Sequence, residues 1–499
     1  MFSNTQGLIL MEIVFITAEM EPFAKTGGLA DVCGSLPQEI VALGHRVSVF
    51  LPKYRSVSEH KYSLELLLDP IDIPVGTEVE TGRLYGGRWG DVNVFFIDQP
   101  YLYDRDALYG TPMGDYPDND IRFIFFQRAV IESLKKLKLK PDIIHCHDWQ
   151  GGLIPVYLKT IYRKDPFYKD TKTIFTIHNL AYQGNFPPDS ISTTGLSWDE
   201  FRYDRLEFYG KISFLKGGLV YSDLLTTVSK RYAEEIQTSD FGCGMESVLS
   251  DRKDELVGIL NGIDLKEWNP AHDPDIPKNY TAKTIERKTE CKLALQKENK
   301  LKVDPDVPLF GFIGRLSSQK GIDLLEPIIE NIKKAGWQLI LLGTGDDQYQ
   351  QRFREAARKF PQHFSAHITF DGAMAKRIYA GVDLFLMISQ YEPCGLGQMY
   401  ALRYGTVPLV REVGGLVDTV TPYKARSHKG TGFRFLDYTP QTLFKTMKKA
   451  VQVFQDKEAW RKLILRGMEC DFSWQASARQ YVDVYERAEK KTISDSSGL

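Results

Sequence analysis

A short glycine-containing turn near the start of the chain has the composition of a phosphate-binding site. Residues 25–29 (Lys-Thr-Gly-Gly-Leu) lie between an apolar strand-like run at residues 13–16 and a run with apolar residues at helical spacing. Paired glycines such as Gly27 and Gly28 let a ligand approach the backbone, and the first N–H groups of the helix would face that ligand. Lys25 adds a positive charge beside them. The same residues also fit a plain tight turn under a buried helix, so both interpretations stay open at this point.

Polar side chains also follow two later strand-like runs. His145, His147 and Asp148 close the fourth run of the first half, and His178 and Asn179 close the fifth. Because the carboxyl ends of neighbouring parallel strands share one edge, these side chains are expected to converge there. A metal site is disfavoured, because the first two histidines lie within the strand and no further carboxylate completes a ligand set.

Two basic residues follow the first strand-like run of the second half. Arg315 and Lys320 lie in the loop 314–321, which has a glycine at each end and leads into a helix. A guanidinium fork and an ammonium point charge at this spacing can both bind one diphosphate. The alternative is a solvated basic loop.

A second glycine-rich segment is residues 392–397, Glu-Pro-Cys-Gly-Leu-Gly, which precedes another helix. The Glu392 carboxylate is suited to sugar hydroxyls or to a positively charged transition state. The backbone amides of Gly395, Leu396 and Gly397 can hold phosphate at the helix start. Further on, residues 414–416 repeat the Gly-Gly-Leu of the first turn.

Length and composition restrict the class of protein. The chain has 499 residues, which favours two domains, and 63 basic against 65 acidic residues give a net charge of −2. This balance argues against a nucleic acid or an anionic membrane as the main partner. Six singly placed cysteines, the lack of a membrane-length apolar run and the lack of a basic leader favour a cytoplasmic protein with reduced thiols.

Strand-like and helical stretches alternate along both halves of the chain, which predicts an α/β fold of two facing doubly wound, Rossmann-like domains with a deep cleft between them. The expected domains are residues 11–257, together with a crossover helix at 475–490, and residues 258–474. Residues 264–306 are expected to form a helical excursion with a loop. Residues 1–10 would be a disordered extension or the result of a start-site choice, and the tail after residue 492 would be frayed. The predicted strands are 13–17, 46–51, 92–97, 142–147, 173–178, 224–228, 309–313, 338–342, 367–370, 384–388, 407–410 and 432–435.

Taken together and in order, these blocks resemble the bacterial glycogen synthases and starch synthases, which are glucosyltransferases of GT-B architecture. The resemblance runs from Met11 to about Ala488, and the combination of blocks is specific although no single block is. The blocks are KTGGLADV (25–32), HCHDW (145–149), IHNLAYQG (177–184), GCGMESVL (242–249), LNGID (260–264), GRLSSQKG (314–321), EPCGLGQ (392–398) and DFSW (471–474).

The resemblance implies the activity and its substrates. The family transfers glucose from ADP-glucose to the non-reducing end of an α-1,4-glucan with retained configuration and without a metal or other cofactor. Neither a nucleic acid nor a membrane is implied as a partner, and the oligomeric state, the product (glycogen or starch) and processivity stay open.

The resemblance also implies roles for matching residues. Lys25, Gly27 and Gly28 would contact the donor diphosphate and the transferred sugar, and Arg315 and Lys320 would neutralise the leaving diphosphate. Other donor contacts would come from the second domain, namely Glu392 on the glucose and Cys394, Gly395, Leu396 and Gly397 on sugar and phosphate. Residues lining the first domain's side of the cleft, around glucose and acceptor, would be Glu19, Asp148 and His178. Asn261 would lie in the same cleft.

The chain departs from the family pattern at a few positions. Val413 stands where a threonine is common, and Gly372 stands where an acidic residue is common near the nucleoside pocket. These departures motivate one alternative, a weakly active or non-catalytic relative that binds glucan and regulates a true synthase. A phosphorylase of the same architecture is the other alternative, and it would need a pyridoxal lysine and a longer chain.

Retention of configuration needs either a protein nucleophile or attack from the face of the leaving group. Asp148 and Glu392 fall in different predicted domains, so a fixed separation of about 5 Å, as in retaining hydrolases, is not expected. The hypothesis is therefore same-face attack, in which the leaving phosphate takes the acceptor's proton.

Overall fold

The computed structural model describes residues 10–111 and 113–491. The expectations for residues 1–9 and for the tail after residue 491 lie outside this part of the chain. The described chain forms two compact units. Unit 1 comprises residues 10–228, 233–262 and 474–491, and unit 2 comprises residues 229–232 and 263–473. The chain thus leaves unit 1 a few residues after the expected boundary and returns to it at Trp474.

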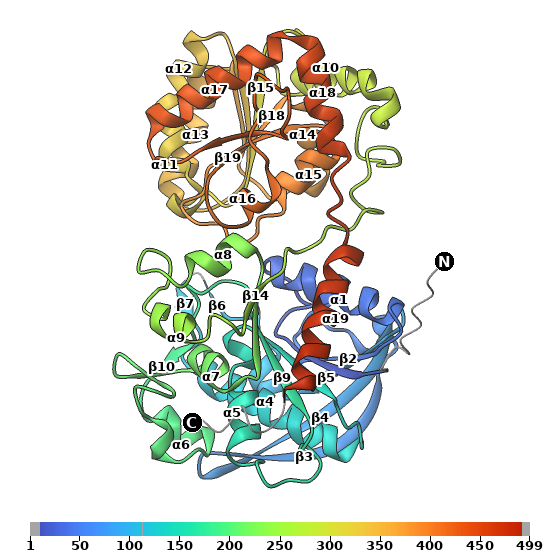
Figure 1. The fold of residues 1–499 in the computed structure, drawn as a ribbon, viewed down its shortest axis with the longest axis vertical. Helices are drawn as coiled ribbons and strands as arrows, with labels where there is room; N and C mark the ends of the chain where they lie inside the picture. Colours follow the sequence, from blue (N-terminus) through green and yellow to red (C-terminus); the bar gives the residue numbers. More distant parts are fainter. Residues whose placement is uncertain (1–9, 112, 492–499) are drawn as a thin grey trace. The chain divides into compact units, whose positions relative to one another are not determined.

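Unit 1 is built on a nine-stranded sheet with the order β14-β13-β9-β8-β1-β2-β5-β4-β3 (Figure 1). The strands from β14 to β5 are parallel to their neighbours, whereas β3 and β4 form an antiparallel hairpin against β5. The strands are β1 (Glu12–Ile16), β2 (Arg46–Pro52), β3 (Glu65–Val75), β4 (Glu78–Trp89), β5 (Val92–Asp98), β8 (Ile143–His147), β9 (Lys172–Ile177), β13 (Leu224–Thr227) and β14 (Leu256–Gly258).

The helices of unit 1 cover this sheet and share its apolar core. Both helix predictions are confirmed by α1 (Gly28–Ala42) and α19 (Trp474–Lys490), whose buried apolar residues pack together with β1 and β2. Leu43, the last apolar position expected in the first helix, follows α1 and is partly buried. The other helices are α2 (Glu59–Tyr62), α3 (Pro100–Tyr103), α4 (Asn119–Lys136), α5 (Leu153–Lys159), α6 (Ser190–Thr194), α7 (Phe214–Tyr221), α8 (Lys230–Glu235, which begins in unit 2) and α9 (Glu246–Asp251). Short strands outside the main sheet are β6 (Gly110–Thr111), β7 (Gly114–Asp115), β10 (Asn185–Phe186), β11 (Glu207–Phe208) and β12 (Lys211–Ser213).

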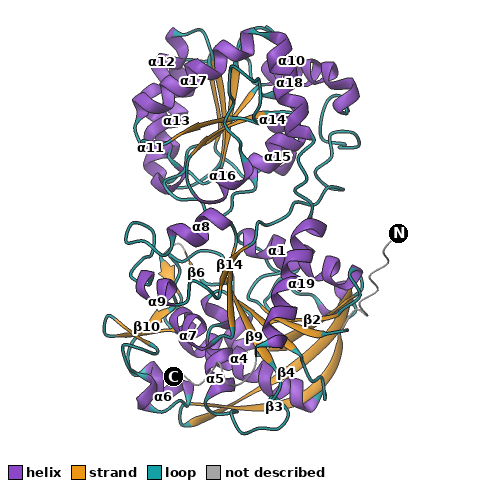
Figure 2. Ribbon diagram, viewed as in Figure 1, coloured by secondary structure: helices purple, strands orange, loops and turns teal. Residues whose placement is uncertain are grey.

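Unit 2 has a six-stranded parallel sheet with the order β17-β16-β15-β18-β19-β20. Helices lie on both faces of it (Figure 2). Its strands are β15 (Leu309–Ile313), β16 (Gln338–Leu342), β17 (Phe364–His367), β18 (Leu384–Met387), β19 (Val407–Arg411) and β20 (Phe433–Phe435). Its helices are α10 (Lys288–Glu298), α11 (Ile322–Leu325), α12 (Ile329–Lys334), α13 (Asp347–Lys359), α14 (Gly372–Gly381), α15 (Gly397–Arg403), α16 (Gly414–Thr419), α17 (Pro440–Gln455) and α18 (Lys457–Met468). The expected helical excursion within residues 264–306 is confirmed by α10.

Three strand predictions need correction. The long hairpin β3–β4 was not predicted, because its residues are largely exposed and its register shifts break the alternation of apolar and polar residues. The strand expected at 367–370 is β17, which ends at His367, because the register with β16 buries Phe364 instead. Finally, β14 extends the sheet where only a connection between domains was expected.

A buried hydrogen bond joins the last helix to the sheet of unit 1. The Tyr485 hydroxyl of α19 lies 2.8 Å from Nδ1 of His145 in β8, and both residues are fully buried. Tyr485→Phe leaves that ring nitrogen without its partner in a site that water does not reach. We expect this change to lower the free energy of unfolding by about 1–3 kcal/mol, measured by urea unfolding.

The matched control is Tyr203→Phe, because that ring is 80% exposed. It should change the free energy of unfolding by less than about 0.5 kcal/mol. Equal effects of the two substitutions would show that the bond to His145 contributes nothing measurable.

Candidate active site

The predicted site residues gather at the switch point of each sheet. In unit 1 the strand order reverses between β1 and β8, and in unit 2 it reverses between β15 and β18. Open parallel sheets bind ligands beyond the carboxyl ends of the strands at such points. The first glycine turn follows β1, Asp148 follows β8, and the basic loop 314–321 follows β15.

Glu19 organises the turn that follows β1. Its buried carboxylate accepts hydrogen bonds from the N–H groups of Thr26 (2.6 Å) and Gly27 (3.1 Å), and from the hydroxyls of Thr26 (2.5 Å) and Tyr109 (2.8 Å). This corrects one expectation, because the N–H of Gly27 is already bound to a carboxylate and does not point freely at a ligand. Glu19 therefore holds the turn at residues 25–29 in place, in addition to its expected place in the lining of the site.

The conformations of Gly27 and Gly28 bear on the open choice between a ligand site and a tight turn. Neither glycine has a positive φ, and a Cβ atom added at either would meet no other atom within 4 Å. Neither the backbone nor the packing of the described chain therefore requires glycine here. In contrast, a Cβ at Gly414 or Gly415 would lie about 2 Å from the carbonyl oxygens of Glu392 and Cys394 respectively. The first pair leaves open space for a ligand, whereas the second pair is needed for packing.

Lys25 is paired with two acidic neighbours. Its ammonium lies 2.7 Å from Asp31 and 3.3 Å from Glu21, with its side chain 45% exposed. Burial opposes its charged form, but these two carboxylates together raise the pKa of Lys25 above its ordinary value. The residue therefore stays charged at the start of α1.

Asp148 combines an unusual backbone with a perturbed carboxyl group. Its φ of 52° and ψ of −174° lie in a region that non-glycine residues rarely adopt and that costs about 1–3 kcal/mol. Its carboxylate accepts a 2.7 Å hydrogen bond from the N–H of His178, at the end of the neighbouring strand. Burial raises the pKa of Asp148 to about 7, although backbone hydrogen bonds oppose that rise. Strained residues of this kind are frequent at functional sites.

The three histidines converge as predicted and form a chain of contacts. The rings of His145 and His147 have their centroids 4.2 Å apart, and Nδ1 of His147 lies 3.0 Å from Nε2 of His178. Burial lowers the pKa of all three, that of His178 to about 3, so the rings are neutral at pH 7.

The neutral state determines where the protons lie. Nε2 of His147 is buried without a hydrogen-bond partner among the described residues. An unpaired buried N–H is rarer than an unpaired acceptor, so the proton of His147 is assigned to Nδ1, where it donates to His178. His178 then carries its own proton on Nδ1 and can donate it to a substrate oxygen.

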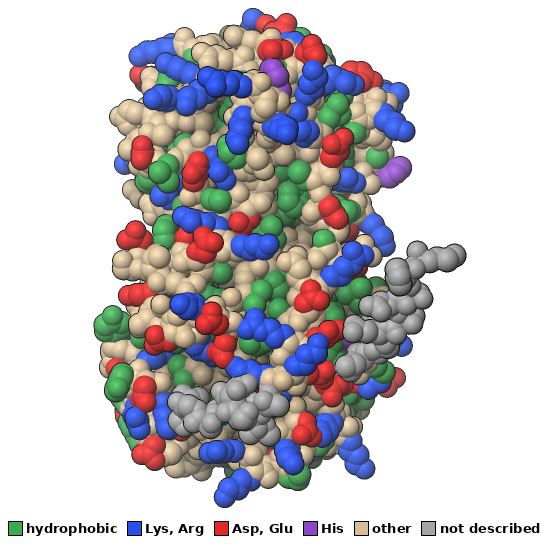
Figure 3. Space-filling model, viewed as in Figure 1, with side chains coloured by type: hydrophobic (Ala, Val, Ile, Leu, Met, Phe, Trp, Pro, Cys, Tyr) green, Lys and Arg blue, Asp and Glu red, His purple; other side chains and the backbone are tan. Residues whose placement is uncertain are grey.

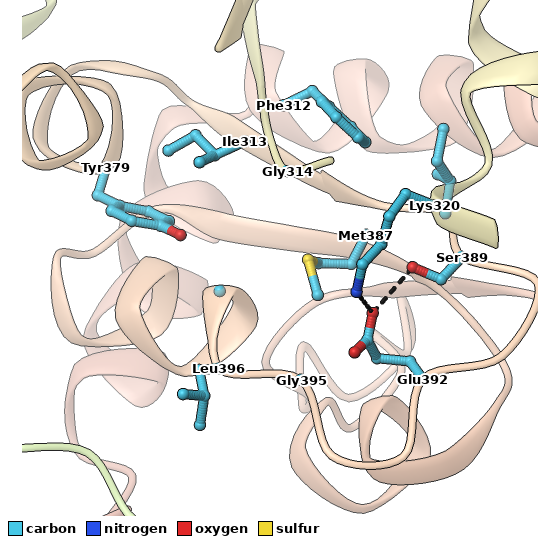
Figure 4. A pocket seen from close by; sticks show the side chains of 12 residues that line it. Phe312, Ile313, Gly314, Lys320, Tyr379, Met387, Ser389, Glu392, Gly395 and Leu396 are labelled. Carbon is cyan, nitrogen blue, oxygen red and sulfur yellow. Dashed lines mark hydrogen bonds and ion pairs between the residues drawn. The ribbon is translucent and has the colours of Figure 1, made fainter. Parts of the chain in front are cut away.

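Unit 2 contains a pocket of about 150 Å³ at its switch point (Figure 4). It is formed where the ends of β15 and β18 meet the start of α15. Its lining residues are Phe312, Ile313, Gly314, Lys320, Tyr379, Met387, Ile388, Ser389, Glu392, Gly395, Leu396 and Gly397. Five of the predicted site residues are among them.

An ion pair lies at one side of this pocket. The ammonium of Lys320 is 2.6 Å from Oε2 of Glu392, and the Ser389 hydroxyl donates to the same oxygen at 2.9 Å. The Glu392 side chain is 8% exposed and that of Lys320 is 27% exposed. The structure thus joins two residues that the sequence only suggested separately. Arg315 is exposed and forms no ion pair with any residue that the structure describes.

The remaining predicted residues are also placed. Asn261, just after β14, is buried with its Oδ1 lacking a partner within the described chain. Cys394 is buried but does not line the pocket. Val413 is the residue before α16 and provides no side-chain cap, which a threonine there could supply. A Cβ at Gly372 would enter open space.

Three residues near the two switch points, and one that follows the edge strand β17, were missed in the sequence. Ser389, Tyr379 and Tyr109 contact the site only through the tertiary fold, and no local pattern marks them. Phe370 lies just beyond β17 and is 95% exposed. The signal for Phe370 was its position as an aromatic residue just after a strand. The predicted strand at 367–370 included Phe370 within the strand, so this position was not recognised.

Within residues 10–111 and 113–491, no group of three or more His, Cys, Asp and Glu side chains is arranged to hold a metal ion. None of the helices in this part of the chain is both long and apolar enough to cross a membrane.

Comparison with known proteins identifies the family. The family model for the starch synthase catalytic domain matches residues 12–251, and the model for glycosyl transferases group 1 matches residues 295–462. The glycogen synthase of Syntrophotalea carbinolica is 46% identical over 96% of this chain and 99% of its own. This chain belongs to the glycogen and starch synthase family. The glycogen synthase of Koribacter versatilis is 45% identical over 96% of this chain and 99% of its own.

A solved structure supports the same assignment. The catalytic domain of starch synthase IV from Arabidopsis thaliana, bound to ADP and acarbose, superposes with a TM-score of 0.88 and is 33% identical. The match covers 97% of this chain and 100% of that one. The expected two-domain α/β fold of GT-B type and the glucosyltransferase activity of this synthase are thereby confirmed. The names of these relatives support neither the regulatory alternative nor the phosphorylase.

The raised pKa of Asp148 predicts a pH-dependent stability. Between about pH 4 and pH 7 the folded state binds a proton on Asp148 that the unfolded state has lost, so folding is favoured less as the pH rises. Asp148→Asn has no titrating carboxyl group, and its side chain has nearly the same size and shape. From pH 5 to pH 8, the wild type should lose about 3 kcal/mol of unfolding free energy relative to this variant.

Urea unfolding at both pH values measures this difference. Asp170→Asn is the control, because the Asp170 side chain is 71% exposed in a surface ion pair. If the two variants follow the same pH dependence, the carboxyl of Asp148 titrates normally.

Proposed function

We propose that this synthase transfers glucose from ADP-glucose to the non-reducing end of an α-1,4-glucan, with retention of configuration and without a metal or other cofactor. The observation that carries the proposal is the pair Gly27 and Gly28, which leaves open space that no packing requires, at the switch point of unit 1. A diphosphate could approach the backbone there. Lys25 would supply positive charge beside it.

The second half of the donor site would come from unit 2. Lys320 and Arg315 would neutralise the charge that develops on the leaving ADP, together with the amides at the start of α15. Glu392, which Lys320 and Ser389 hold, would accept hydrogen bonds from the glucose hydroxyls. Phe370 would offer an exposed ring for the nucleoside base. Because these groups belong to a different unit from Lys25 and His178, turnover would require the two units to close on the substrate.

The acceptor side would be formed by unit 1. His178 would donate from Nδ1 to a sugar oxygen, and Glu19 and Asn261 would line the surroundings. Burial keeps the pKa of His178 near 3, so this ring acts as a neutral donor and not as a charged acid. The Asp148 carboxylate holds the backbone of His178, which suits a positioning role.

The transfer would proceed by attack on the same face as the leaving group. Both candidate nucleophiles are already engaged: Asp148 accepts from a backbone N–H, and Glu392 accepts from Lys320 and Ser389. The bond from the anomeric carbon to the diphosphate breaks, the acceptor hydroxyl forms the new bond, and the leaving phosphate takes the hydroxyl proton. Mass spectrometry during turnover should detect no glucosylated protein. A glucosyl adduct on either carboxylate would overturn this mechanism.

The donor and acceptor are tested by initial rates on glycogen. ADP-glucose should support incorporation of labelled glucose at a much higher rate than UDP-glucose, and EDTA should leave the rate unchanged. No incorporation from either donor would overturn the proposal and favour the regulatory relative. The free thiols of all six cysteines agree with a cytoplasmic location, which stays a proposal.

Lys320 provides the sharpest test of an individual residue. Lys320→Ala should lower the turnover number at least about a hundredfold, because one charge-stabilising contact to the leaving group is typically worth two to three decades in rate. The substitution also leaves the buried Glu392 carboxylate without its ion-pair partner. Urea unfolding of the variant, measured beside its turnover, therefore distinguishes loss of folding from loss of rate.

The control is Lys333→Ala, an exposed lysine on α12 of the same unit. It should keep the wild-type turnover number. Near-normal turnover by a folded Lys320→Ala variant would rule out the role assigned to Lys320.

A further inference from the structure

Two exposed tyrosines lie beside the candidate site of unit 1, and neither belongs to the proposed donor or catalytic groups. Tyr182 is 53% exposed and Tyr209 is 82% exposed. Exposed rings of this kind combine a large apolar face with a polar hydroxyl, which suits contact with a ligand that is itself part apolar and part polar.

Tyr182 is held close to the end of β9. Its N–H donates to the carbonyl of Asn179 at 3.2 Å, and the Asn179 side chain accepts from the N–H of Ala181 at 3.1 Å. This closes a β-turn, so the Cα atoms of Asn179 and Tyr182 are less than about 7 Å apart. The ring of Tyr182 therefore starts one turn away from His178.

Tyr209 occupies the tip of a hairpin in an unfavourable conformation. It connects β11 to β12 together with Gly210, and the two residues have φ of 47° and 75°. Such two-residue turns favour Asn-Gly, because bulky residues at positive φ are strained. The Tyr209 ring packs edge-on against Phe208, but asparagine would suit this backbone better. A strained tyrosine that is also 82% exposed points to a role outside folding.

One loop joins the two tyrosines. The side chain of Gln183 donates to the carbonyl of Cys243 at 2.9 Å. The next residue, Gly244, is packed so closely that an added Cβ would lie 3.2 Å from the ring of Tyr209. A buried hydrogen bond fixes the hairpin to α7, because the ammonium of the buried Lys216 donates to the carbonyl of Glu207 at 2.7 Å. The path from Asn179 to Tyr209 is thus continuous and anchored.

We infer that Tyr182 and Tyr209 form an outer acceptor subsite, on which an α-1,4-glucan strand lies as it leaves the candidate site of unit 1. The inference rests on the proposed function, since the occupant is the glucan acceptor. Sugar rings have apolar faces that stack on aromatic rings, and the amides of Gln183 and Asn185 beside Tyr182 can bind the hydroxyls. Figure 3 shows exposed hydrophobic side chains at the left margin of the view. The turn of Tyr182 directly follows His178 and Asn179.

The subsite predicts a specific kinetic change. Tyr182→Ala and Tyr209→Ala should each raise KM for glycogen about fivefold, with kcat and KM for ADP-glucose unchanged. With a short acceptor such as maltose, which does not extend beyond the catalytic residues, neither substitution should change KM. Tyr101→Ala is the matched control, because Tyr101 is 79% exposed on α3 of the same unit, and it should resemble the wild type.

Two further substitutions at the hairpin separate binding from folding. Tyr209→Asn removes the ring but suits the positive φ, so it should keep or raise the melting temperature and still raise KM for glycogen. Tyr209→Phe keeps the ring and should keep the wild-type KM. A wild-type KM for Tyr209→Asn, or a raised KM for glycogen and maltose alike, would overturn the subsite.

Native electrophoresis in gels containing glycogen tests binding without turnover. The wild type should be retarded, and Tyr182→Ala and Tyr209→Ala should be retarded less. The wild type could transfer no glucose and yet be retarded more than the two tyrosine variants. That result would overturn the proposed function but support glucan binding at Tyr182 and Tyr209. If glucose is transferred and the variants match the wild type in KM and retardation, the proposed function is supported and the subsite is overturned. The same result is expected if Tyr182 and Tyr209 bind another protein.

Discussion

The candidate site of unit 1 depends on one hydrogen bond, from the N–H of His178 to the carboxylate of Asp148. It joins the ends of two neighbouring parallel strands at the point where both leave the sheet. The strained backbone of Asp148 directs its side chain across this gap, and the surrounding burial makes the bond strong. The turn carrying Tyr182 begins directly after His178, so the proposed acceptor surface depends on the same bond.

Unit 2 reaches a comparable arrangement by different means. Its switch point holds a buried carboxylate, Glu392, that is fixed by an ammonium and a hydroxyl and not by backbone N–H groups. The loop carrying Glu392 packs directly on Gly414 and Gly415. The repeated Gly-Gly-Leu therefore serves two purposes in one chain. In unit 1 it leaves space at the surface, and in unit 2 it brings two loops together. Sequence similarity between the two turns gave no indication of this difference.

Much of the fold followed from the sequence, because buried parallel strands are short apolar runs that stand out between helices. The hairpin β3–β4 did not, since it lies at the edge of the sheet with mostly exposed residues. Residue types after the strands indicated His178 at the carboxyl edge of one sheet, and Lys320 and Glu392 at the carboxyl edge of the other. Partners could not be predicted, because the contact of Lys320 with Glu392 and the capture of the Gly27 N–H by Glu19 depend on tertiary distances. The strain at Asp148 and Tyr209 likewise appears only in backbone angles.

The two lysines of the candidate sites are each paired with a carboxylate, and this limits how a diphosphate can be bound. Lys25 already contacts Asp31 and Glu21, so two of its three N–H donors are engaged. Lys320 contacts Glu392 and retains two N–H donors within the described chain. A phosphate can therefore join Lys320 without displacing Glu392, which keeps that carboxylate fixed for the sugar. At Lys25 the incoming charge must compete with two carboxylates, so this lysine is suited to hold the ligand loosely and to release it. In the proposed donor site, unit 2 would therefore provide most of the affinity, and unit 1 would provide the close approach.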